Sequence, residues 1–370
     1  MLQVYYRIVV SAWKTFGLKP IFWRWALLMP IFIVFTHLTL FLDHIFFPQF
    51  RKTQVKNPIF IIGHPRSGNT FLHKLLTQTD EFVAFQTWQI LFPSLTARVL
   101  VKPFVNYLIK KNKSSLIPDQ VGHGVSLDKV EEEELLFFHK LDTQFVWARS
   151  PLGFDDQEHP EFRFHDLQPS SRRLSSINFF KGCLQRQIYS TGKQQVILQT
   201  LQSVHRIKTI IEAFPDAKFI YLVRSPAETI PSHLSVLWLL LDLQLGVKNI
   251  PADKLKRYID RRYRYNVDLY RYFYELQKNQ EISEDRVMIV RYDQLRSNLE
   301  QTFTEIVDFT GIKPSNQLKQ AVKQQAQNQQ NYQRKHQLVN LEVLSLSQEQ
   351  ISQDFDFVFE QYGFSQSKSI

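Results

Sequence analysis

Residues 59–76 join a short apolar run, a glycine-containing turn and an apolar-periodic segment, in the order IFIIGHPRSGNTFLHKLL. Gly63 and Gly68 bracket the turn, and a helix is predicted to begin within residues 67–70. Unpaired backbone N–H groups and the positive end of the helix dipole make such a start an anion site, and glycines let a phosphate approach the backbone closely. The segment therefore predicts a phosphate cradle.

The details of this cradle differ from those of a Walker loop. Asn69 follows the second glycine, where a Walker loop has lysine, although Thr70 stands where the metal-binding Ser or Thr would be. The cation lies earlier, at Arg66. A second apolar run, residues 218–223, ends at Arg224, where a Mg-dependent NTPase normally carries an acid. We therefore predict no metal at this site.

Arg224 is itself suited to bind a phosphate, because a guanidinium donates paired hydrogen bonds to an oxyanion. Pro226 stands where a following helix could begin. Ser232 lies eight residues after Arg224, about two turns into that helix, and could donate a second hydrogen bond to the same anion. The chain thus predicts two phosphate-binding motifs.

The loop GHPRSGNT, together with Arg224 and Ser232, resembles the sulfotransferases that use 3′-phosphoadenosine 5′-phosphosulfate (PAPS), particularly the branch whose loop contains Arg-Ser-Gly-Thr. The resemblance runs from about residue 57 to about residue 364. It implies that Arg66, Ser67, Gly68, Asn69 and Thr70 bind the 5′-phosphosulfate, that Arg224 and Ser232 bind the 3′-phosphate, and that the product is 3′,5′-ADP.

Two further segments resemble cofactor-binding parts of that family. VMIVRYDQL is similar to its Arg-Tyr-Glu-x-Leu segment and implies a cofactor contact from Tyr292. Residues 332–336 (YQRKH) resemble its late basic loop and imply contacts from Arg334 and Lys335.

Sulfuryl transfer needs a cation at the departing phosphate and a base for the acceptor hydroxyl. Arg66 is the predicted cation, since it would stabilise charge that grows in the transition state. The run of glutamates at 131–134 resembles the family segment that supplies an active-site carboxylate, and we predict Glu132 as the base. His64, inside the loop, is the alternative base. A solvated first helical turn is the other interpretation of the acidic run.

At helical spacing the four glutamates would cover the whole circumference of a helix, so that at least one faces inward and the others point elsewhere. An inward carboxylate beside an aromatic pocket would have its pKa raised toward that of a useful base.

One segment departs from the family pattern. In QTLQSVHRI, Gln199 replaces the family lysine, while Arg206 remains at its corresponding place. This loss of a cation leaves open a membrane-attached binding or scaffold protein with a catalytically silent site. A P-loop kinase is a third alternative, but it would need a lysine at position 69 or an acid at position 224.

The four apolar runs 59–62, 196–199, 218–223 and 287–290 are separated by helical stretches. They predict an α/β fold of the P-loop nucleotide-binding type, with a central parallel sheet flanked by helices. Both phosphate motifs follow strand ends, where active sites of such sheets lie. Residues 320–333, rich in Gln and Asn, predict a mobile polar segment.

The N-terminal region has a different character. Residues 25–42 form an apolar helical segment of 18 residues without Asp, Glu, Lys or Arg, interrupted by Pro30 and His37. A spanning helix needs about 20 apolar residues, so a tilted span, an interfacial helix and a helix packed on the domain all remain open. We divide the chain into a membrane-associated segment, residues 1–50, and a sulfotransferase domain, residues 57–365.

Composition limits the partners. The 370 residues carry a net charge of +10, which suits a polyanionic cofactor, a nucleic acid or an acidic membrane equally. No nucleic acid is predicted, because the cations are scattered and no binding module is recognisable. The single Cys183 excludes an internal disulfide and favours a reducing, cytoplasmic location, with membrane association through residues 1–50. The acceptor stays open between a small-molecule, a lipid and a carbohydrate hydroxyl.

Overall fold

The computed structural model describes residues 2–17, 20–117, 124–329 and 338–365. A four-stranded sheet at its centre has the order β4-β1-β5-β6, and each neighbouring pair is parallel. The strands are β1 (Ile59–Gly63), β4 (Ile197–Gln199), β5 (Lys218–Val223) and β6 (Val287–Arg291). The predicted strands and the parallel sheet are confirmed, with bounds that differ from the prediction by one residue at most.

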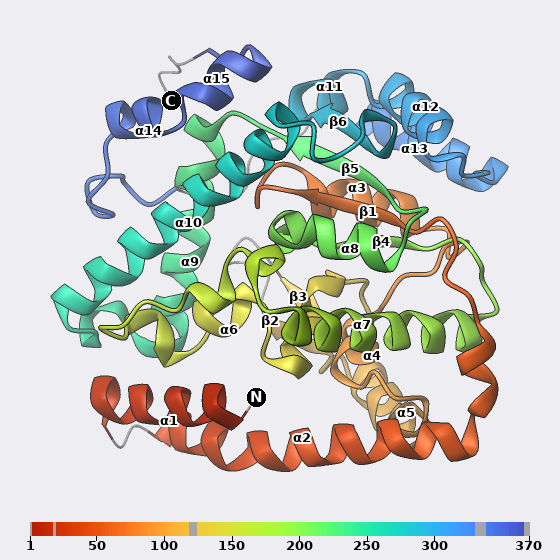
Figure 1. The fold of residues 1–370 in the computed structure, drawn as a ribbon, viewed down its shortest axis with the longest axis horizontal. Coiled ribbons are helices and arrows are strands. Elements are labelled where there is room, and N and C mark those ends of the chain that lie inside the picture. The colour runs from red at the N-terminus through yellow and green to blue at the C-terminus, as the bar shows by residue number, and fades with distance from the viewer. Residues whose placement is uncertain (1, 18–19, 118–123, 330–337, 366–370) are drawn as a thin grey trace.

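Helices cover both faces of the sheet (Figure 1). Alternate residues of β1 face opposite sides, because side chains alternate along a strand. Phe60 and Ile62 pack with α7 (Ser170–Thr191), α8 (Ile207–Ala213) and α10 (Ala252–Lys278). Ile59 and Ile61 pack with α3 (Asn69–Thr77), α11 (Tyr292–Ser297), α12 (Leu299–Thr310) and α13 (Asn316–Gln329). Continuous burial of β1, β4 and nearly all of β5 explains their largely apolar sequence, whereas β6 at the edge of the sheet is only partly buried.

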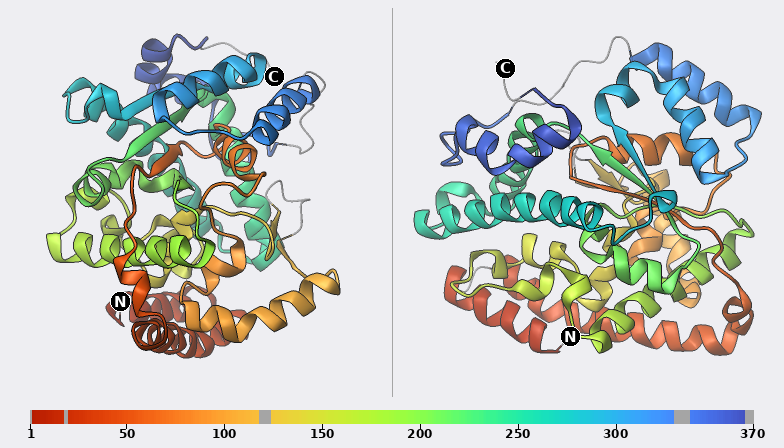
Figure 2. Two further views of the ribbon diagram at one scale, coloured as in Figure 1. Left: turned by 90° about the vertical axis from the view of Figure 1, so that its right-hand side faces the viewer. Right: turned by 45° about the horizontal axis from the view of Figure 1, so that its top comes forward.

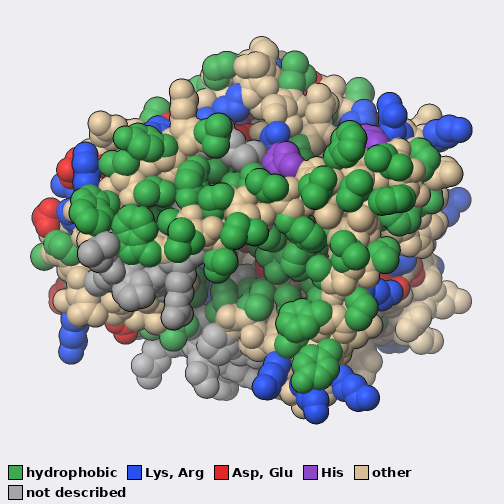
Figure 3. Space-filling view, turned by 90° about the horizontal axis from the view of Figure 1, so that it is seen from below, with side chains coloured by type: hydrophobic (Ala, Val, Ile, Leu, Met, Phe, Trp, Pro, Cys, Tyr) green, Lys and Arg blue, Asp and Glu red, His purple; other side chains and the backbone are tan. Residues whose placement is uncertain are grey.

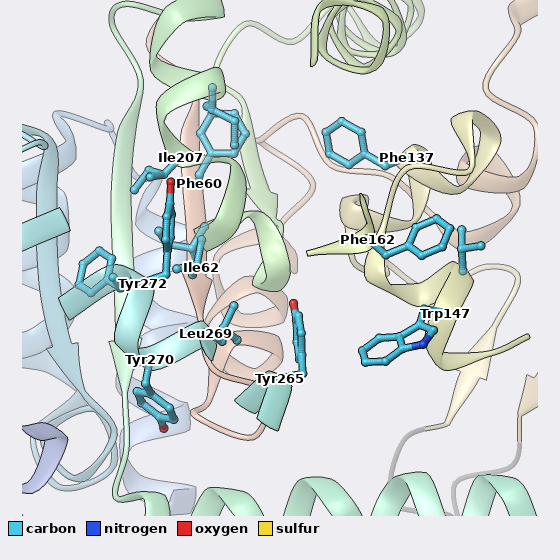
Figure 4. Packing of buried hydrophobic residues seen from close by; sticks show 14 of the residues in the cluster. Phe60, Ile62, Phe137, Trp147, Phe162, Ile207, Tyr265, Leu269, Tyr270 and Tyr272 are labelled. Atoms are coloured by element: carbon cyan, nitrogen blue, oxygen red, sulfur yellow. The ribbon is translucent and has the colours of Figure 1, made fainter. Parts of the chain in front are cut away.

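The first of these two cores extends well beyond the sheet. In Figure 4, Tyr265 lies between the β1 residues Phe60 and Ile62 on one side and Trp147 and Phe162 on the other. The remaining elements complete the fold. They are α4 (Thr87–Leu91), α5 (Leu95–Lys110), α6 (Gln144–Ala148), α9 (Pro226–Leu245), α14 (Gln348–Asp354), α15 (Asp356–Tyr362), the hairpin β2 (Ser115–Ile117) and β3 (Val125–Ser126), and 3₁₀ helices including η3 (Glu133–Lys140) and η4 (Pro151–Phe154).

The N-terminal helices α1 (Leu2–Phe16) and α2 (Pro20–Phe46) lie along one side of the molecule, opposite the C-terminal end of the chain (Figures 1 and 2). Val4, Ile8, Phe16 and Met29 belong to the same core as the sheet residues. The apolar N-terminal helical segment is therefore present, and its inner side is packed on the domain.

Two expectations about local structure are wrong. The Gln- and Asn-rich stretch 320–333 was predicted as a mobile polar segment, but its described part, residues 320–329, belongs to α13, whose Leu318 and Val322 are buried in the same core as α3 and α12; residues 330–333 lie outside the described residues. The acidic run was predicted to lie on a helix, but Glu132 has an extended backbone and η3 begins only at Glu133.

Candidate active site

The loop between β1 and α3 is held close to the sheet by its first glycine. Gly63 has a φ of 139°, and a Cβ there would lie 2.3 Å from the carbonyl oxygen of Leu222 in β5. Arg66 and Gly68 also have positive φ, of 72° and 97°, and α3 begins directly afterwards at Asn69. The chain therefore turns sharply out of the strand and directs the N-terminus of α3 into the loop.

Side chains inside the loop leave a polar concavity. The hydroxyl of Ser67 is buried and has no hydrogen-bond partner of normal geometry among the described residues. Asn69 donates to the carbonyl oxygen of His64 at 2.9 Å, which ties the two ends of the loop together. Thr70 accepts a hydrogen bond from Gln199 at 3.0 Å. A buried hydroxyl beside a helix N-terminus fits an anionic ligand.

The two predicted phosphate motifs meet at Arg66. Its Nε donates to the Ser232 hydroxyl at 3.0 Å, and Nη1 of Arg224 donates to the Arg66 carbonyl oxygen at 3.2 Å. The guanidinium of Arg224 also lies 4.2 Å from the centre of the Tyr292 ring, and a Cβ at Gly68 would lie 2.8 Å from that ring. The structure thus brings together residues that are far apart in the sequence.

Some residues of the segments that resemble the family lie outside this site or outside the described part of the chain. Arg334 and Lys335, predicted to contact the cofactor, lie outside the described residues. Arg291 pairs with Asp293, two residues further along the chain, at 2.6 Å. It also donates to the carbonyl oxygen of Tyr362 in α15.

The acidic run is buried throughout, so its alternative interpretation as a solvated first helical turn is wrong. Glu133 accepts hydrogen bonds from the backbone N–H groups of Phe85 and Gln199, at 3.1 and 2.7 Å. Glu134 accepts from the hydroxyls of Thr143 and Ser203, at 3.1 and 2.6 Å. These two carboxyls connect segments of the fold, and each of their oxygens has a hydrogen-bond partner.

Glu132 differs from these two neighbours. Its Oε2 is buried without a hydrogen-bond partner among the described residues. It lines a pocket of about 120 Å³ whose wall also contains Arg66 and Thr70 of the loop and apolar side chains of α9 such as Leu237. Burial, reinforced by the nearby Glu131 carboxyl, raises the pKa of Glu132 to about 8. This carboxyl is therefore positioned and tuned to take up a proton near neutral pH.

His64 lies beneath the loop, and this arrangement argues against its predicted role as the alternative base. Its Nδ1 is 2.6 Å from the Pro65 carbonyl oxygen, and its Nε2 is 2.8 Å from Oδ1 of Asn266. Burial lowers the pKa of His64 to about 4. Among the described residues, the pocket wall contains His233 but not His64.

His233 lies in the wall of this pocket but was not predicted from the sequence. Its Nδ1 is 2.8 Å from Oδ1 of Asn266, whose amide orientation is set by a hydrogen bond from Nδ2 to the Arg262 carbonyl oxygen. The neutral ring then donates from Nδ1 and keeps its lone pair on Nε2. Burial lowers the pKa of His233 to about 3, so it is neutral at pH 7 but a weak base. Its position directly after Ser232 was the only available signal.

The departure from the family pattern also has a structural basis. Gln199 is buried and bonds to Thr70, so an uncharged amide supports the loop from within. Arg206 does not supply the missing cation, because it is buried against Asp142 at 3.1 Å and lies 3.7 Å from the centre of the Phe137 ring.

Comparisons with known proteins agree with this geometry. The model of the Sulfotransferase family matches residues 58–316. Two proteins named omega-hydroxy-beta-dihydromenaquinone-9 sulfotransferase Stf3, from Mycobacterium bovis and Mycobacterium tuberculosis, are 27% identical over 267 residues, which is 69% of this chain and 63% of each relative. The chain therefore spans less than two thirds of the length of these relatives.

Solved structures show the same fold at lower identity. Sulfotransferase STF1 from Mycobacterium tuberculosis superposes with a TM-score of 0.67 at 16% identity, covering 94% of this chain and 90% of that one. Sulfotransferase STF9 from Mycobacterium avium gives a TM-score of 0.68 at 17% identity, covering 88% of this chain and 82% of that one.

Proposed function

This chain belongs to the sulfotransferase family, and we propose that it transfers a sulfuryl group from PAPS to the hydroxyl of a small-molecule or lipid acceptor. The observation that carries the proposal is a shared pocket. Arg66 and Thr70 of the anion-binding loop and the carboxyl of Glu132 line the same pocket. A donor held by the loop and an acceptor hydroxyl held near Glu132 would therefore meet.

The loop fits the 5′ end of PAPS through the N-terminus of α3 and the buried Ser67 hydroxyl. We assign Arg66, Ser67, Gly68, Asn69 and Thr70 to the 5′-phosphosulfate. When bound, PAPS supplies the sulfuryl group and a phosphate leaving group.

The opposite end of the cofactor is assigned by the second motif. We place the 3′-phosphate at Arg224 and Ser232, with Tyr292 stacked beneath the Arg224 guanidinium. Arg334 and Lys335 stay predictions from the family resemblance.

Two side chains of the pocket have roles in the transfer itself. Arg66 places a cation where negative charge grows on the leaving oxygen, which lowers the barrier more than it strengthens ground-state binding. Glu132 in its ionised form accepts the proton of the acceptor hydroxyl.

A lipid alcohol is the acceptor that we favour over a carbohydrate. The wall of the pocket contains Phe145, Leu201, Leu237 and Leu240, which suit an apolar acceptor, beside polar side chains such as Gln202 and Gln244. The relatives at 27% identity are named for an omega-hydroxy dihydromenaquinone.

We propose that residues 1–50 attach the sulfotransferase domain, residues 57–365, to a membrane surface. Helix α2 is inverted relative to a soluble amphipathic helix: its buried positions include Thr36, Thr39 and Asp43. Its exposed positions follow a helical stripe, which we call the α2 stripe: Leu27, Ile31, Val34, Leu38, Phe41 and Ile45. Figure 3 shows that hydrophobic side chains cover the centre of this face, with Lys and Arg toward its edges. Such a patch suits an anionic bilayer.

Residues 26–46 have the length and composition of a membrane span, and 28% of the 18-residue apolar stretch within them is buried. The attachment can be tested with vesicles of neutral and of anionic lipid. Wild-type protein should float with anionic vesicles, the Val34→Asp/Leu38→Asp double variant should not, and the Gln54→Asp control should behave as wild type. Equal flotation of all three proteins would refute attachment through the α2 stripe.

Calorimetry and transfer assays test the function itself. Binding of 3′,5′-ADP in EDTA, together with transfer of labelled sulfate from PAPS to a long-chain alcohol, is the expected result. Metal-dependent ATP binding would instead indicate a P-loop kinase. Nucleotide binding without transfer to any acceptor would indicate a silent scaffold.

A further inference from the structure

A second pocket lies between the N-terminal helices and the sulfotransferase domain. It has a volume of about 260 Å³ and is lined by α1, α2, η4 and the C-terminal part of α9. We call it the tail pocket. Its wall is mainly apolar and includes Ile8, Ala12, Phe22, Ala26, Phe154 and Leu245. An apolar cavity of about 150 Å³ is already large enough to bind benzene.

The tail pocket adjoins the pocket that contains Glu132. Ala148, Arg149, Leu241 and Gln244 line both of them. The Arg149 guanidinium lies 4.8 Å from the centre of the Phe145 ring, so its charge is held against an aromatic wall. The two pockets thus adjoin at these four residues, between the N-terminal helices and the acidic run.

We propose that the tail pocket binds the hydrocarbon chain of the acceptor, an alcohol whose hydroxyl lies at Glu132 and whose chain passes Arg149 to end between α1, α2 and α9. The inference rests on the proposed function and makes the N-terminal helices part of the substrate site. The tail pocket is a mainly apolar concavity, and an apolar chain that fills it would remove both its own surface and the pocket wall from water.

The wall of the tail pocket favours an apolar occupant. The Ser150 hydroxyl accepts from the backbone N–H of Leu152, and the Tyr258 hydroxyl at the neighbouring pocket donates to the Ala148 carbonyl oxygen, so each already has one hydrogen-bond partner inside the protein. A hydrocarbon chain requires no such partners.

The position of the tail pocket also suggests where the chain comes from. Phe22 and Ala26 of α2 line it, while the α2 stripe lies on the exposed face of the same helix. A lipid alcohol could thus leave a bilayer beside α2 and enter the tail pocket without crossing an extended polar surface.

Chain-length dependence tests the inference. Primary alcohols from four to twelve carbons are compared as acceptors by kcat/KM with labelled PAPS. For wild-type protein, kcat/KM should rise by about fourfold for each CH₂ that becomes buried. Ala12→Phe fills the tail pocket from α1 and should lower kcat/KM at least tenfold for dodecanol while changing that for butanol less than twofold.

Two further variants make the result decisive. Leu245→Trp fills the tail pocket from the opposite wall and should give the same profile, which guards against a folding defect in the first variant. Gln3→Phe adds the same aromatic ring on the exposed side of α1 and should match wild type at every length.

The outcomes separate this inference from the function on which it rests. Transfer that is independent of chain length, or a wild-type profile in both filled variants, would overturn the tail pocket alone. Transfer to no alcohol of any length would overturn the proposed function and the tail pocket with it.

Discussion

The Glu132→Gln variant should be slower than wild type and, above pH 5, more stable. Both effects have one cause, the buried and unpartnered Oε2 of Glu132, whose pKa is raised by burial and by Glu131 to about 8. At pH 7 about a tenth of the molecules then carry the carboxylate that accepts the acceptor's proton. Activity should rise with pH through about 8, because only the ionised form can act as a base.

The effect on stability has the opposite dependence on pH. A folded-state pKa above 4.5, the ordinary value for a glutamate, means that the native protein holds a proton that the unfolded chain has released. The contribution of Glu132 to stability is therefore fully present below pH 4.5 and is lost as pH rises to about 8. Each pKa unit is about 1.4 kcal/mol, so the loss amounts to a few kcal/mol. Glutamine cannot ionise and escapes this loss.

The assay compares wild type and Glu132→Gln from pH 5 to 9, by urea unfolding and by transfer to an aliphatic and a phenolic acceptor. The variant should lose about 10² to 10⁴ in rate with the aliphatic alcohol and much less with the phenol, which is already partly ionised. Its stability advantage should grow from pH 5 to pH 8.

A different base would give a different profile. Since the pKa of His233 is lowered by burial to about 3, a His233 base would be fully active from pH 5 upward. A flat pH–rate profile with an unchanged rate in Glu132→Gln would refute the assignment, and His233→Asn should then show the loss.

Further substitutions address the cofactor site and the packing of α2. Arg224→Ala should weaken 3′,5′-ADP binding by about 2 to 4 kcal/mol in calorimetry with little effect on 5′-AMP, and equal losses would refute the 3′-phosphate assignment. Arg66→Ala should lower turnover more than 3′,5′-ADP affinity. Because Arg66 donates to Ser232, the free-energy effects of Arg66→Ala and Ser232→Ala should not add in the double variant, with a coupling energy of about 0.5 to 3 kcal/mol. Strict additivity would contradict that contact. Asp43→Asn should cost about 3 to 5 kcal/mol in urea unfolding, since it leaves the buried Arg186 without a charged partner, and a loss below about 1 kcal/mol would mean that the pair is not formed.

The sheet and the proximity of the two phosphate motifs could be predicted because their signals are local. Each strand is an apolar run between turn residues, and parallel strands place their carboxyl ends at one edge. Arg66 and Arg224 follow two such strands, β1 and β5, which are neighbours in the sheet. Their closeness follows from topology alone.

The surroundings of the acidic run could not be predicted, because its partners come from distant segments. Glu133 is held by the backbone of Phe85 and Gln199, and Glu134 by hydroxyls of Thr143 and Ser203. Without these contacts, a row of glutamates is typical of a solvated helix start. Periodicity could not identify the one carboxyl that faces the pocket.

Helix α2 shows why hydropathy alone leaves the relation to a membrane undecided. The helix is apolar on every side, so its sequence does not say which face is buried. Asp43 connects α2 to the domain. Its carboxylate accepts hydrogen bonds from Ser94, Leu95 and Thr96 at the start of α5 and from Arg186 of α7. With Asp43 fixed near its C-terminal end and Met29 buried in the core, the helix has its α2 stripe on the surface of the domain. The same apolar sequence that would suit a span is then suited to lie flat on a bilayer, beside the pocket that we assign to the acceptor chain.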